Sequence, residues 1–315
     1  MAKPSPDSTP VLRLLVLELW GLGDLALALP FLRAASTHTR VTLLAKPLAA
    51  PLLARFAPAV ELVPLIAPWT AFSKKYRLHR WPWAELGRAL RTLRSGRFDA
   101  GVSARRDPRD HLLLALAGAH RRLGFARAGS RVLLTDALPS PLRPHRAEHW
   151  TALAREFGWE PSPPAPRPAA VAGRHVVIHP GAGHPVRVWP RDRFELLAGR
   201  LRTAGWQVTM LEVFTTDLEA LLAVLASADR FIGNDSGPGH LAALLGVPTF
   251  TIFGPQLPEL FAPQHPQAAW IEGAACPHKP CFDDCPFRAP YCLLEVDADS
   301  VWQRLQSWLP TAGSG

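Results

Sequence analysis

Short apolar runs alternate with longer segments of mixed polarity along this chain. The run at 11–17 is interrupted only by Arg13 and predicts a strand buried on both faces. The glycine-rich stretch 20–24 predicts a turn, and 25–35 predicts a helix. The same alternation then predicts strands at 41–44, 60–64 and 98–102, an irregular stretch at 67–83, and helices at 83–95 and 111–119.

A proline-rich segment interrupts this pattern. Five of the nine residues at 160–168 are proline, which excludes a helix or a central strand and predicts a linker. The alternation then starts again. It predicts strands at 175–179, 207–213, 230–233 and 249–253, and helices at 191–204, 218–226 and 299–309.

Repeated strand–helix alternation on both sides of a linker predicts two doubly wound, Rossmann-like α/β domains. Ligands of such sheets bind at the carboxyl ends of the strands, so we expect the two domains to face a cleft that holds the site. The predicted order is a disordered start at 1–10, a first domain at 11–159, the linker at 160–170, a second domain at 171–298, and a closing helix and tail at 299–315.

Charge is distributed unevenly over the 315 residues. Residues 1–150 hold 23 Lys and Arg against 10 Asp and Glu, whereas residues 151–315 hold 12 against 16. The basic half predicts an anionic partner, although an arginine-rich composition without function fits the same numbers. Glu18 and Asp24 interrupt the longest apolar run, which is unsuitable for a membrane span or a signal peptide. We expect a cytoplasmic protein.

An Asp-Ser-Gly turn between an apolar strand and a helix is the most informative segment. Asp235 and Ser236 suit the N-cap, and Pro238 suits the first helical position. The N–H groups of such a turn and the positive end of the helix dipole form an anion site, for which a diphosphate is the expected ligand. An ordinary strand-to-helix turn fits the same residues.

Two further strand ends carry candidate chemistry. Gly183 permits close approach to a ligand, and Arg187 can hold phosphate oxygens with two donors, although a loop arginine is also typical of a solvated surface. Asp24 follows the first strand and can act as a general base or merely cap a helix. Its glycines do not match the dinucleotide fingerprint.

Four cysteines fall within seventeen residues, at Cys276, Cys281, Cys285 and Cys292. Four thiols can ligate zinc, but the spacing has no Cys-x-x-Cys pair. A reduced cluster packed in a loop is therefore favoured, and no metal is expected.

A basic segment with interleaved aromatic residues follows in the first domain. It fits an anionic membrane face or glycolipid, nucleic acid stacked on the aromatic rings, or a solvated surface. The candidate acceptor-binding residues of this segment are Lys74, Lys75, Arg77 and Arg80.

These motifs together resemble glycosyltransferase family 9, the bacterial lipopolysaccharide heptosyltransferases. The resemblance rests on Gly-Asp and Ala-Leu-Pro within 22–31, His-Pro-Gly-Ala before Trp189 and Pro190, Asn-Asp-Ser-Gly at 234–237 with His-Leu-Ala at 240–242, and the cysteine-rich loop after 253–255. It implies the GT-B fold and an inverting, metal-independent enzyme without a cofactor. Such enzymes transfer heptose from ADP-heptose to the lipopolysaccharide inner core.

The resemblance also implies roles for individual residues. Asp24 would deprotonate the acceptor hydroxyl, Arg187 would stabilise the departing diphosphate where the family commonly has lysine, and Asp235 would position the donor sugar. The ADP pocket would be lined by Gly183, Ser236, Gly237, Pro238 and His240. An anionic lipopolysaccharide-type acceptor and peripheral contact with the inner membrane surface are implied, and no nucleic acid is expected.

Two departures from the family pattern remain. Glu18 stands where the family often has a basic residue. The apolar segment 208–211 also passes almost directly into 212–218, where family members place a glycine-rich turn, a helix and a further strand, and the turn supplies part of the nucleotide pocket. An alternative is therefore a catalytically impaired member that binds glycolipid or a membrane surface.

Overall fold

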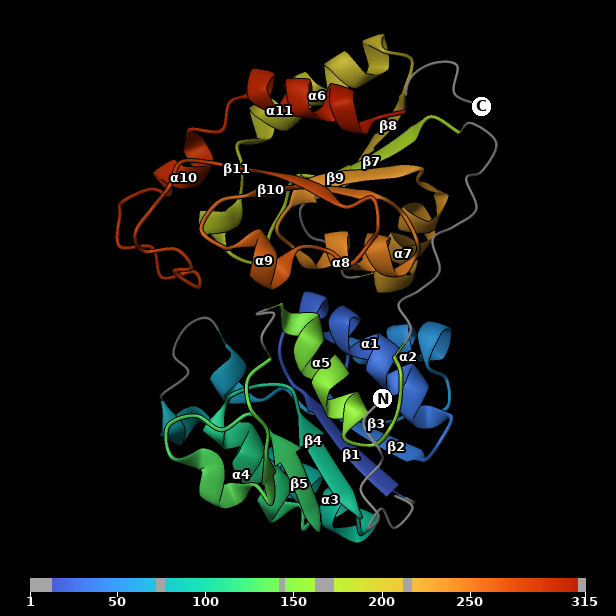
Figure 1. The fold of residues 1–315 in the computed structure, drawn as a ribbon, viewed down its shortest axis with the longest axis vertical. Coiled ribbons are helices and arrows are strands. Elements are labelled where there is room, and N and C mark those ends of the chain that lie inside the picture. The colour runs from blue at the N-terminus through green and yellow to red at the C-terminus, as the bar shows by residue number, and fades with distance from the viewer. Residues whose placement is uncertain (1–12, 72–76, 142–144, 162–172, 212–216, 311–315) are drawn as a thin grey trace. The chain divides into compact units, whose positions relative to one another are not determined.

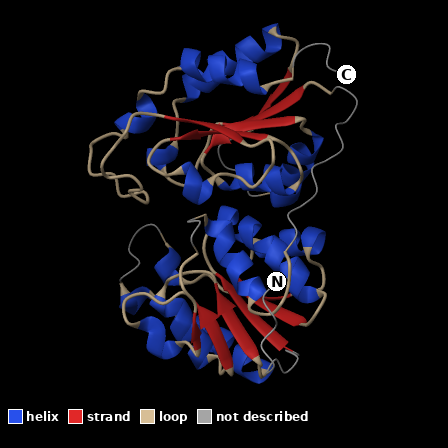
Figure 2. Cartoon of the chain, viewed as in Figure 1, coloured by secondary structure: helices blue, strands red, loops and turns tan. Residues whose placement is uncertain are grey.

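The computed structural model describes residues 13–71, 77–141, 145–161, 173–211 and 217–310. The chain forms two compact units, Met1–Ser162 and Pro163–Gly315. Each unit contains one parallel sheet with helices on both faces (Figures 1 and 2), which confirms the predicted doubly wound α/β class. The predicted disordered start at 1–10, most of the linker at 160–170 and the tail at 311–315 lie outside the described residues.

The first unit has a six-stranded sheet in the order β3-β2-β1-β4-β5-β6. This is the strand order of the Rossmann fold, with the switch point between β1 and β4. β1 lies between β2 and β4, and five of its six residues are buried, as expected for its apolar sequence. The strands are β1 (Arg13–Glu18), β2 (Arg40–Ala45), β3 (Glu61–Pro64), β4 (Ala100–Ser103), β5 (Arg121–Gly124) and β6 (Asp136–Ala137).

Helices cover both faces of this sheet. In Figure 1, α1 (Leu22–Ser36), α2 (Ala49–Phe56) and α5 (Arg146–Arg155) lie on one face, and α3 (Trp83–Gly96) and α4 (Pro108–Leu116) lie on the other. Leu15 and Leu17 of β1 pack with Leu93 and Leu114 in the core beneath α3 and α4. Three short 3-10 helices are η1 (Pro68–Thr70), η2 (Leu78–Arg80) and η3 (Ser130–Leu133).

The first helix begins earlier than predicted. α1 starts at Leu22, so the predicted turn at 20–24 is too long and Asp24 lies inside the first helical turn. The carboxylate of Asp24 accepts a hydrogen bond from the backbone N–H of Gly21 at 3.3 Å. A side chain that satisfies an otherwise unpaired N–H at a helix start explains the earlier beginning.

The second unit has a five-stranded sheet in the order β11-β10-β9-β7-β8. In Figure 1, α6 and α11 lie on one face, and α7 and α8 lie on the other. The strands are β7 (His175–His179), β8 (Gln207–Met210), β9 (Arg230–Asn234), β10 (Thr249–Phe253) and β11 (Ala269–Glu272). The helices are η4 (Pro185–Arg187), α6 (Arg191–Thr203), α7 (Leu218–Ser227), α8 (Gly237–Leu244), α9 (Pro258–Phe261), α10 (Tyr291–Leu294) and α11 (Ala298–Trp308).

The core of the second unit is built around Trp189. Its side chain is fully buried and meets the ring of Phe194 edge-on at 4.9 Å between centroids. Its indole N–H donates to the carbonyl of Val296 at 2.7 Å. This hydrogen bond ties the loop after β7 to the segment that leads into α11.

β8 is an edge strand of the second sheet, and the connection that follows it to α7 is short. β8 ends at Met210, earlier than the predicted 213, and residues 212–216 lie outside the described residues. Only residues 211–217 separate β8 from α7, whereas α2 and β3 lie between β2 and α3 in the first unit. In the described part of the chain, no strand pairs with the outer edge of β8.

None of the described helices combines the length and the apolar character that crossing a membrane requires.

Candidate functional site

Two polar clusters lie at the carboxyl ends of the strands, one in each unit. In the first unit Asp24 and Arg105 form an ion pair, with 23% and 13% of their side chains exposed. Arg105 follows β4, and its guanidinium carbon lies 4.8 Å from the ring centroid of Trp20. Glu18, the last residue of β1, is buried beside them and accepts a hydrogen bond from the backbone N–H of Trp20 at 3.1 Å. The predicted base is thus held in place by a buried arginine.

Burial dominates the protonation of this cluster. It raises the pKa of Glu18 to about 8, and the attraction of Arg105 only partly opposes that rise. Burial also lowers the pKa of Lys46, which directly follows β2. For Arg105 burial acts to lower the pKa, but the carboxylates of Asp24 and Glu18 outweigh it and leave the pKa raised. At neutral pH Glu18 therefore carries a proton while Arg105 stays charged.

The backbone of Arg105 is fixed by two neighbours. Its N–H donates to the hydroxyl of Ser103 at 3.2 Å, and its carbonyl lies 3.2 Å from Nε2 of His111. Because a carbonyl only accepts, Nε2 carries the hydrogen, and Nδ1 accepts from the hydroxyl of Ser130 at 2.9 Å. Burial lowers the pKa of His111, which favours this neutral form.

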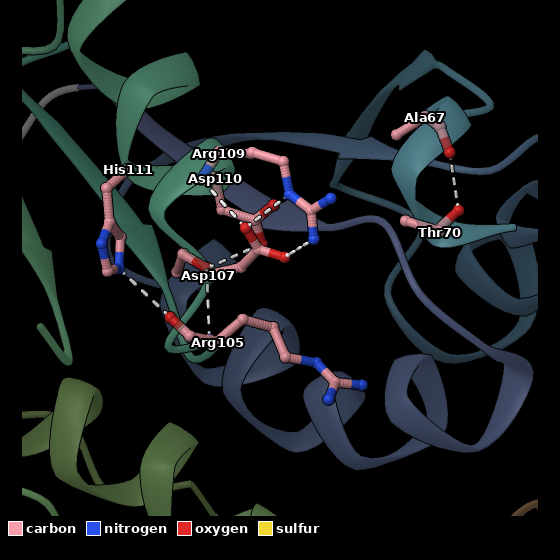
Figure 3. Close-up of polar contacts among 8 residues, drawn as sticks. Ala67, Thr70, Arg105, Asp107, Arg109, Asp110 and His111 are labelled. Atoms are coloured by element: carbon pink, nitrogen blue, oxygen red, sulfur yellow. Dashed lines mark hydrogen bonds and ion pairs between the residues drawn. The ribbon is translucent and has the colours of Figure 1, made fainter. Parts of the chain in front are cut away.

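At the start of α4, the N-cap residue Asp107 forms hydrogen bonds with Arg109 of the first helical turn. Asp107 accepts from the backbone N–H of Arg109 at 2.9 Å and from its guanidinium at 2.8 and 2.6 Å. The side chain of Arg105 extends away from this pair (Figure 3), which keeps its guanidinium available to Asp24. Asp110, one turn along, is fully buried, and burial raises its pKa to about 7.

The predicted acceptor-binding residues follow the carboxyl end of β3. Arg77 precedes η2 and Arg80 ends it, and both are exposed. Lys74 and Lys75 lie outside the described residues. The exposed arginines lie in the segment that joins β3 to α3, on the chain that leaves the same edge of the sheet as Asp24.

In the second unit, adjacent strands β7 and β9 bring the two predicted phosphate loops together. His179 at the end of β7 lies opposite Gly233 of β9. Asn234 ties the loops, because its amide donates to the carbonyls of Pro180 at 2.9 Å and Gly181 at 3.3 Å. Its oxygen accepts from the backbone N–H of Trp189 at 3.0 Å.

Arg187 reaches the Asp-Ser-Gly turn but is also held elsewhere. Its Nη1 lies 3.5 Å from Oδ2 of Asp235. Its Nε lies 2.7 Å from Oδ1 of Asp283, and its Nη2 donates to Oδ2 of the same carboxylate at 3.1 Å. Asp283 belongs to the cysteine-rich loop. The guanidinium therefore lies between two carboxylates from distant parts of the sequence.

The helix that follows the turn begins close to the predicted position. Ser236 is the N-cap of α8, and Pro238 is the second helical residue rather than the first. The hydroxyl of Ser236 makes no capping bond and lies 3.4 Å from Nδ1 of His179. His240 is buried, whereas Gly183 is exposed in the loop after β7. The structure thus brings Arg187, Asp235 and Ser236 together at the start of α8.

Two residues of these clusters were not predicted. Arg105 lies three residues after the predicted strand at 98–102, and the rule that selected Asp24 also applies to this position. Asp283 is 96 residues from its partner Arg187. It lies in a loop without apolar periodicity, so no local pattern indicates it.

The four cysteines are free thiols, and Cys292 is buried. Among the described residues, no three His, Cys, Asp or Glu side chains are arranged to hold a metal ion.

Residues 214–289 match the family model described as glycosyltransferase family 9 (heptosyltransferase). The match contains the Asp235 turn and three of the four cysteines. Lipooligosaccharide heptosyltransferase 2 of Campylobacter jejuni is 30% identical over 95 residues, which cover 30% of each chain. Lipopolysaccharide heptosyltransferase 1 of Pseudomonas aeruginosa is 29% identical over 150 residues, 41% of this chain and 39% of that protein. The matched segments thus span less than half of these curated relatives.

Solved structures resemble the chain over nearly its whole length. E. coli heptosyltransferase WaaC with ADP superposes with a TM-score of 0.72 and 18% identity, covering 95% of this chain and 100% of that chain. E. coli ADP-heptose lps heptosyltransferase II gives 0.67 and 20%, covering 94% and 98%. These likenesses show the fold, which is the two-domain GT-B fold. The segment 214–289 thus resembles glycosyltransferase family 9, and the chain as a whole shares the fold of the solved heptosyltransferases.

Proposed function

We propose that the protein is an inverting, metal-independent glycosyltransferase. In this proposal it moves heptose or a related sugar from an ADP-sugar to a lipopolysaccharide core-type acceptor. The observation that carries the proposal is the cluster at the start of α8, where Arg187 lies 3.5 Å from Asp235, a residue of the segment that matches the family model. Relatives of this family have been solved with ADP and with ADP-2-deoxy-2-fluoro heptose.

The proposed reaction is a single displacement. Asp24 takes the proton of the acceptor hydroxyl while that oxygen bonds to the anomeric carbon of the donor. The bond from that carbon to the diphosphate oxygen breaks, and ADP leaves with the electron pair. Arg187 and the N-terminus of α8 stabilise the charge that grows on the diphosphate. Attack opposite the leaving group inverts the anomeric configuration.

The chemistry of the first cluster supports the assignment of the base. The ion pair with Arg105 fixes the carboxylate of Asp24, and a fixed base needs no reorganisation in the transition state. Arg105 and Arg146 surround the carboxylates with positive charge, and both groups interact electrostatically with Asp24. This charge balance favours an anionic acceptor.

The test is an assay of heptose transfer from ADP-heptose to a heptose-deficient core lipopolysaccharide. The rate is measured as ADP release, and the anomeric configuration of the product is determined by NMR. Asp24→Asn should lower the rate by about 100-fold or more, because general base catalysis contributes about that much. Asp136→Asn is the matched control, since Asp136 is also paired with an arginine of the first unit, at 3.1 Å from Arg121. Near-normal transfer by Asp24→Asn would refute the assignment of the base, and a retained anomer would refute inversion.

We further propose peripheral contact of the first unit with an anionic membrane surface. Leu78 and Trp83 are 55% and 57% exposed beside the exposed arginines Arg77 and Arg80. The indole of Trp83 donates to the carbonyl of Leu78 at 2.9 Å, so the two apolar side chains share one surface. Apolar and cationic groups together are typical of interfacial binding.

Co-sedimentation with vesicles tests this contact. Phosphatidylglycerol vesicles should retain the protein and phosphatidylcholine vesicles should not, and Leu78→Ser with Trp83→Ser should weaken retention. The exposed residue Leu196 of α6 supplies the control Leu196→Ser. The rival function is a glycolipid-binding protein without transfer activity. Such a protein would bind the same vesicles when they carry lipopolysaccharide core, but it would bind no ADP-sugar.

A further inference from the structure

The donor cluster of the second unit has an unfavourable charge for a diphosphate. The guanidinium of Arg187 contributes one positive charge, and the carboxylates of Asp235 and Asp283 contribute two negative charges. All three side chains are largely buried, with 18%, 7% and 18% exposed, so screening by water is limited. As long as both carboxylates remain in contact with Arg187, they offset its charge, and the guanidinium attracts a diphosphate less than it would alone.

We propose that Asp283 is a positioning residue that competes with the donor diphosphate for the guanidinium of Arg187. This inference rests on the proposed function, since it takes a nucleoside diphosphate as the ligand. Binding of the diphosphate displaces the carboxylate, and Arg187 turns from an internal ion pair to the ligand. Asp283 therefore sets the affinity for the donor and rejects anions that hold Arg187 less strongly than a carboxylate does.

The contact geometry supports competition rather than shared binding. Oδ2 of Asp283 accepts a hydrogen bond from Nη2 of Arg187 at 3.1 Å, and Oδ1 lies 2.7 Å from Nε as an ion-pair contact without hydrogen-bond geometry. The edge of a guanidinium formed by Nε and Nη2 is one of those that hold a carboxylate or a phosphate with two parallel bonds. A phosphate group that takes this edge must remove the carboxylate first. Asp235 contacts the other side of the guanidinium, through Nη1.

The loop that carries Asp283 is suited to this release. Phe282 and Asp283 are consecutive non-glycine residues at φ 48° and 75°, in the left-handed region that costs such residues energy. Phe282 is 56% exposed and meets Phe261 edge-on at 6.4 Å. The N–H of Cys281 donates to the carbonyl of Pro255 at 3.3 Å. The ion pair with Arg187 is thus a main tie of a strained and largely exposed segment.

The experiment is calorimetric titration of ADP into the full chain and its variants. Asp283→Asn keeps the size of the side chain and removes the competing charge, so the Kd for ADP should fall on the order of fivefold to tenfold, the range of one partly buried ion pair. Asp284→Asn is the matched control, because Asp284 is the exposed neighbour. In the transfer assay, Asp283→Asn should lower the donor KM and leave the acceptor KM unchanged.

A double-substitution cycle separates competition from a general structural effect. The gain from Asp283→Asn should disappear in the presence of Arg187→Gln, because no guanidinium is then left to release. Equal or weaker ADP binding by Asp283→Asn, or an equal gain from Asp284→Asn, overturns the inference. Thermal melting checks the fold of each variant, and Asp283→Ser carries the same expectation if Asp283→Asn does not fold. If the wild type binds ADP and the variants show no gain, the inference fails and the proposed function stands. If no form binds ADP, the proposed function itself fails and the inference fails with it.

Discussion

Replacing Glu18 with glutamine tests the electrostatics of the first cluster through stability rather than activity. Glu18 is 3% exposed, and its pKa lies near 8 instead of 4.5, mainly because burial disfavours the charged form. Below pH 4.5 the group is protonated in both the folded and the unfolded chain. Between pH 4.5 and 8 the unfolded chain loses the proton while the folded chain keeps it. Stability therefore falls as pH rises through this interval.

The magnitude follows from the size of the shift. One pKa unit corresponds to about 1.4 kcal/mol, so between pH 5 and pH 8 the wild type should lose about 4 kcal/mol relative to Glu18→Gln. Glutamine has the shape of the protonated acid and no proton to lose. Asp110, whose pKa burial raises to about 7, adds a slope of the same sign in both proteins, so the difference between them reports mainly on Glu18.

The assay is urea unfolding at pH 5, 6, 7 and 8, with hydrogen exchange of the β1 peptide to assign the transition to the first unit. Glu85→Gln, at an exposed site in the first turn of α3, is the control for the substitution itself. A difference between wild type and Glu18→Gln that stays constant over this range would refute the proton on Glu18. A wild type that gains relative stability with rising pH would show that Glu18 is ionised against Arg105.

Two further changes probe the second unit. Asn234→Ala removes the hydrogen bonds that tie the loops after β7 and β9, at 3.0, 2.9 and 3.3 Å, and should lower the free energy of unfolding by about 2–3 kcal/mol in urea titrations and weaken ADP binding. ADP binding that is unchanged by Asn234→Ala would show that these loops do not shape the donor site. Trp189→Phe leaves the carbonyl of Val296 without its indole donor and creates a cavity, and it should cost about 1–3 kcal/mol, read as a lower melting temperature. An unchanged melting temperature would contradict the central role of this side chain.

The sequence predicts those elements whose apolar pattern is local. β7 and β10 match their predicted bounds because each is a short apolar run between polar or glycine-rich segments. β5 was missed because two of its four residues are arginines, whose charges are satisfied by Asp136 and by backbone carbonyls rather than by solvent. Such compensation depends on residues that the fold brings in from elsewhere, so no pattern within the strand reveals it.

The same distinction applies to the two clusters. Asp24, Arg187 and Asp235 follow apolar strands, and a strand's carboxyl end is where a doubly wound sheet places ligands. Their partners depend on tertiary structure. The ion pair of Asp24 with Arg105 joins the segments that follow two adjacent strands, and the ion pair of Arg187 with Asp283 joins residues 96 positions apart. The groups were therefore predictable, but the balance of charge around them was not.

The two sheets of this chain show what the short connection after β8 changes and what it leaves intact. In the first unit the chain passes from β2 through α2 and β3 before it crosses to β4, on the other side of β1. In the second unit it passes from β8 straight to α7 and crosses to β9, on the other side of β7. Among the described residues, the second unit thus has no counterpart of α2 and β3 after β8. The sequence comparison with the family pattern leads one to expect a turn, a helix and a strand at this same place. Arg187 and Asp235 are positioned by the loops after β7 and β9, which Asn234 ties together. β9 pairs with the edge of β7 that faces away from β8. Under the proposed function, the residues assigned to the diphosphate are therefore held independently of the shortened edge, and we expect any loss to fall on contacts to the nucleoside.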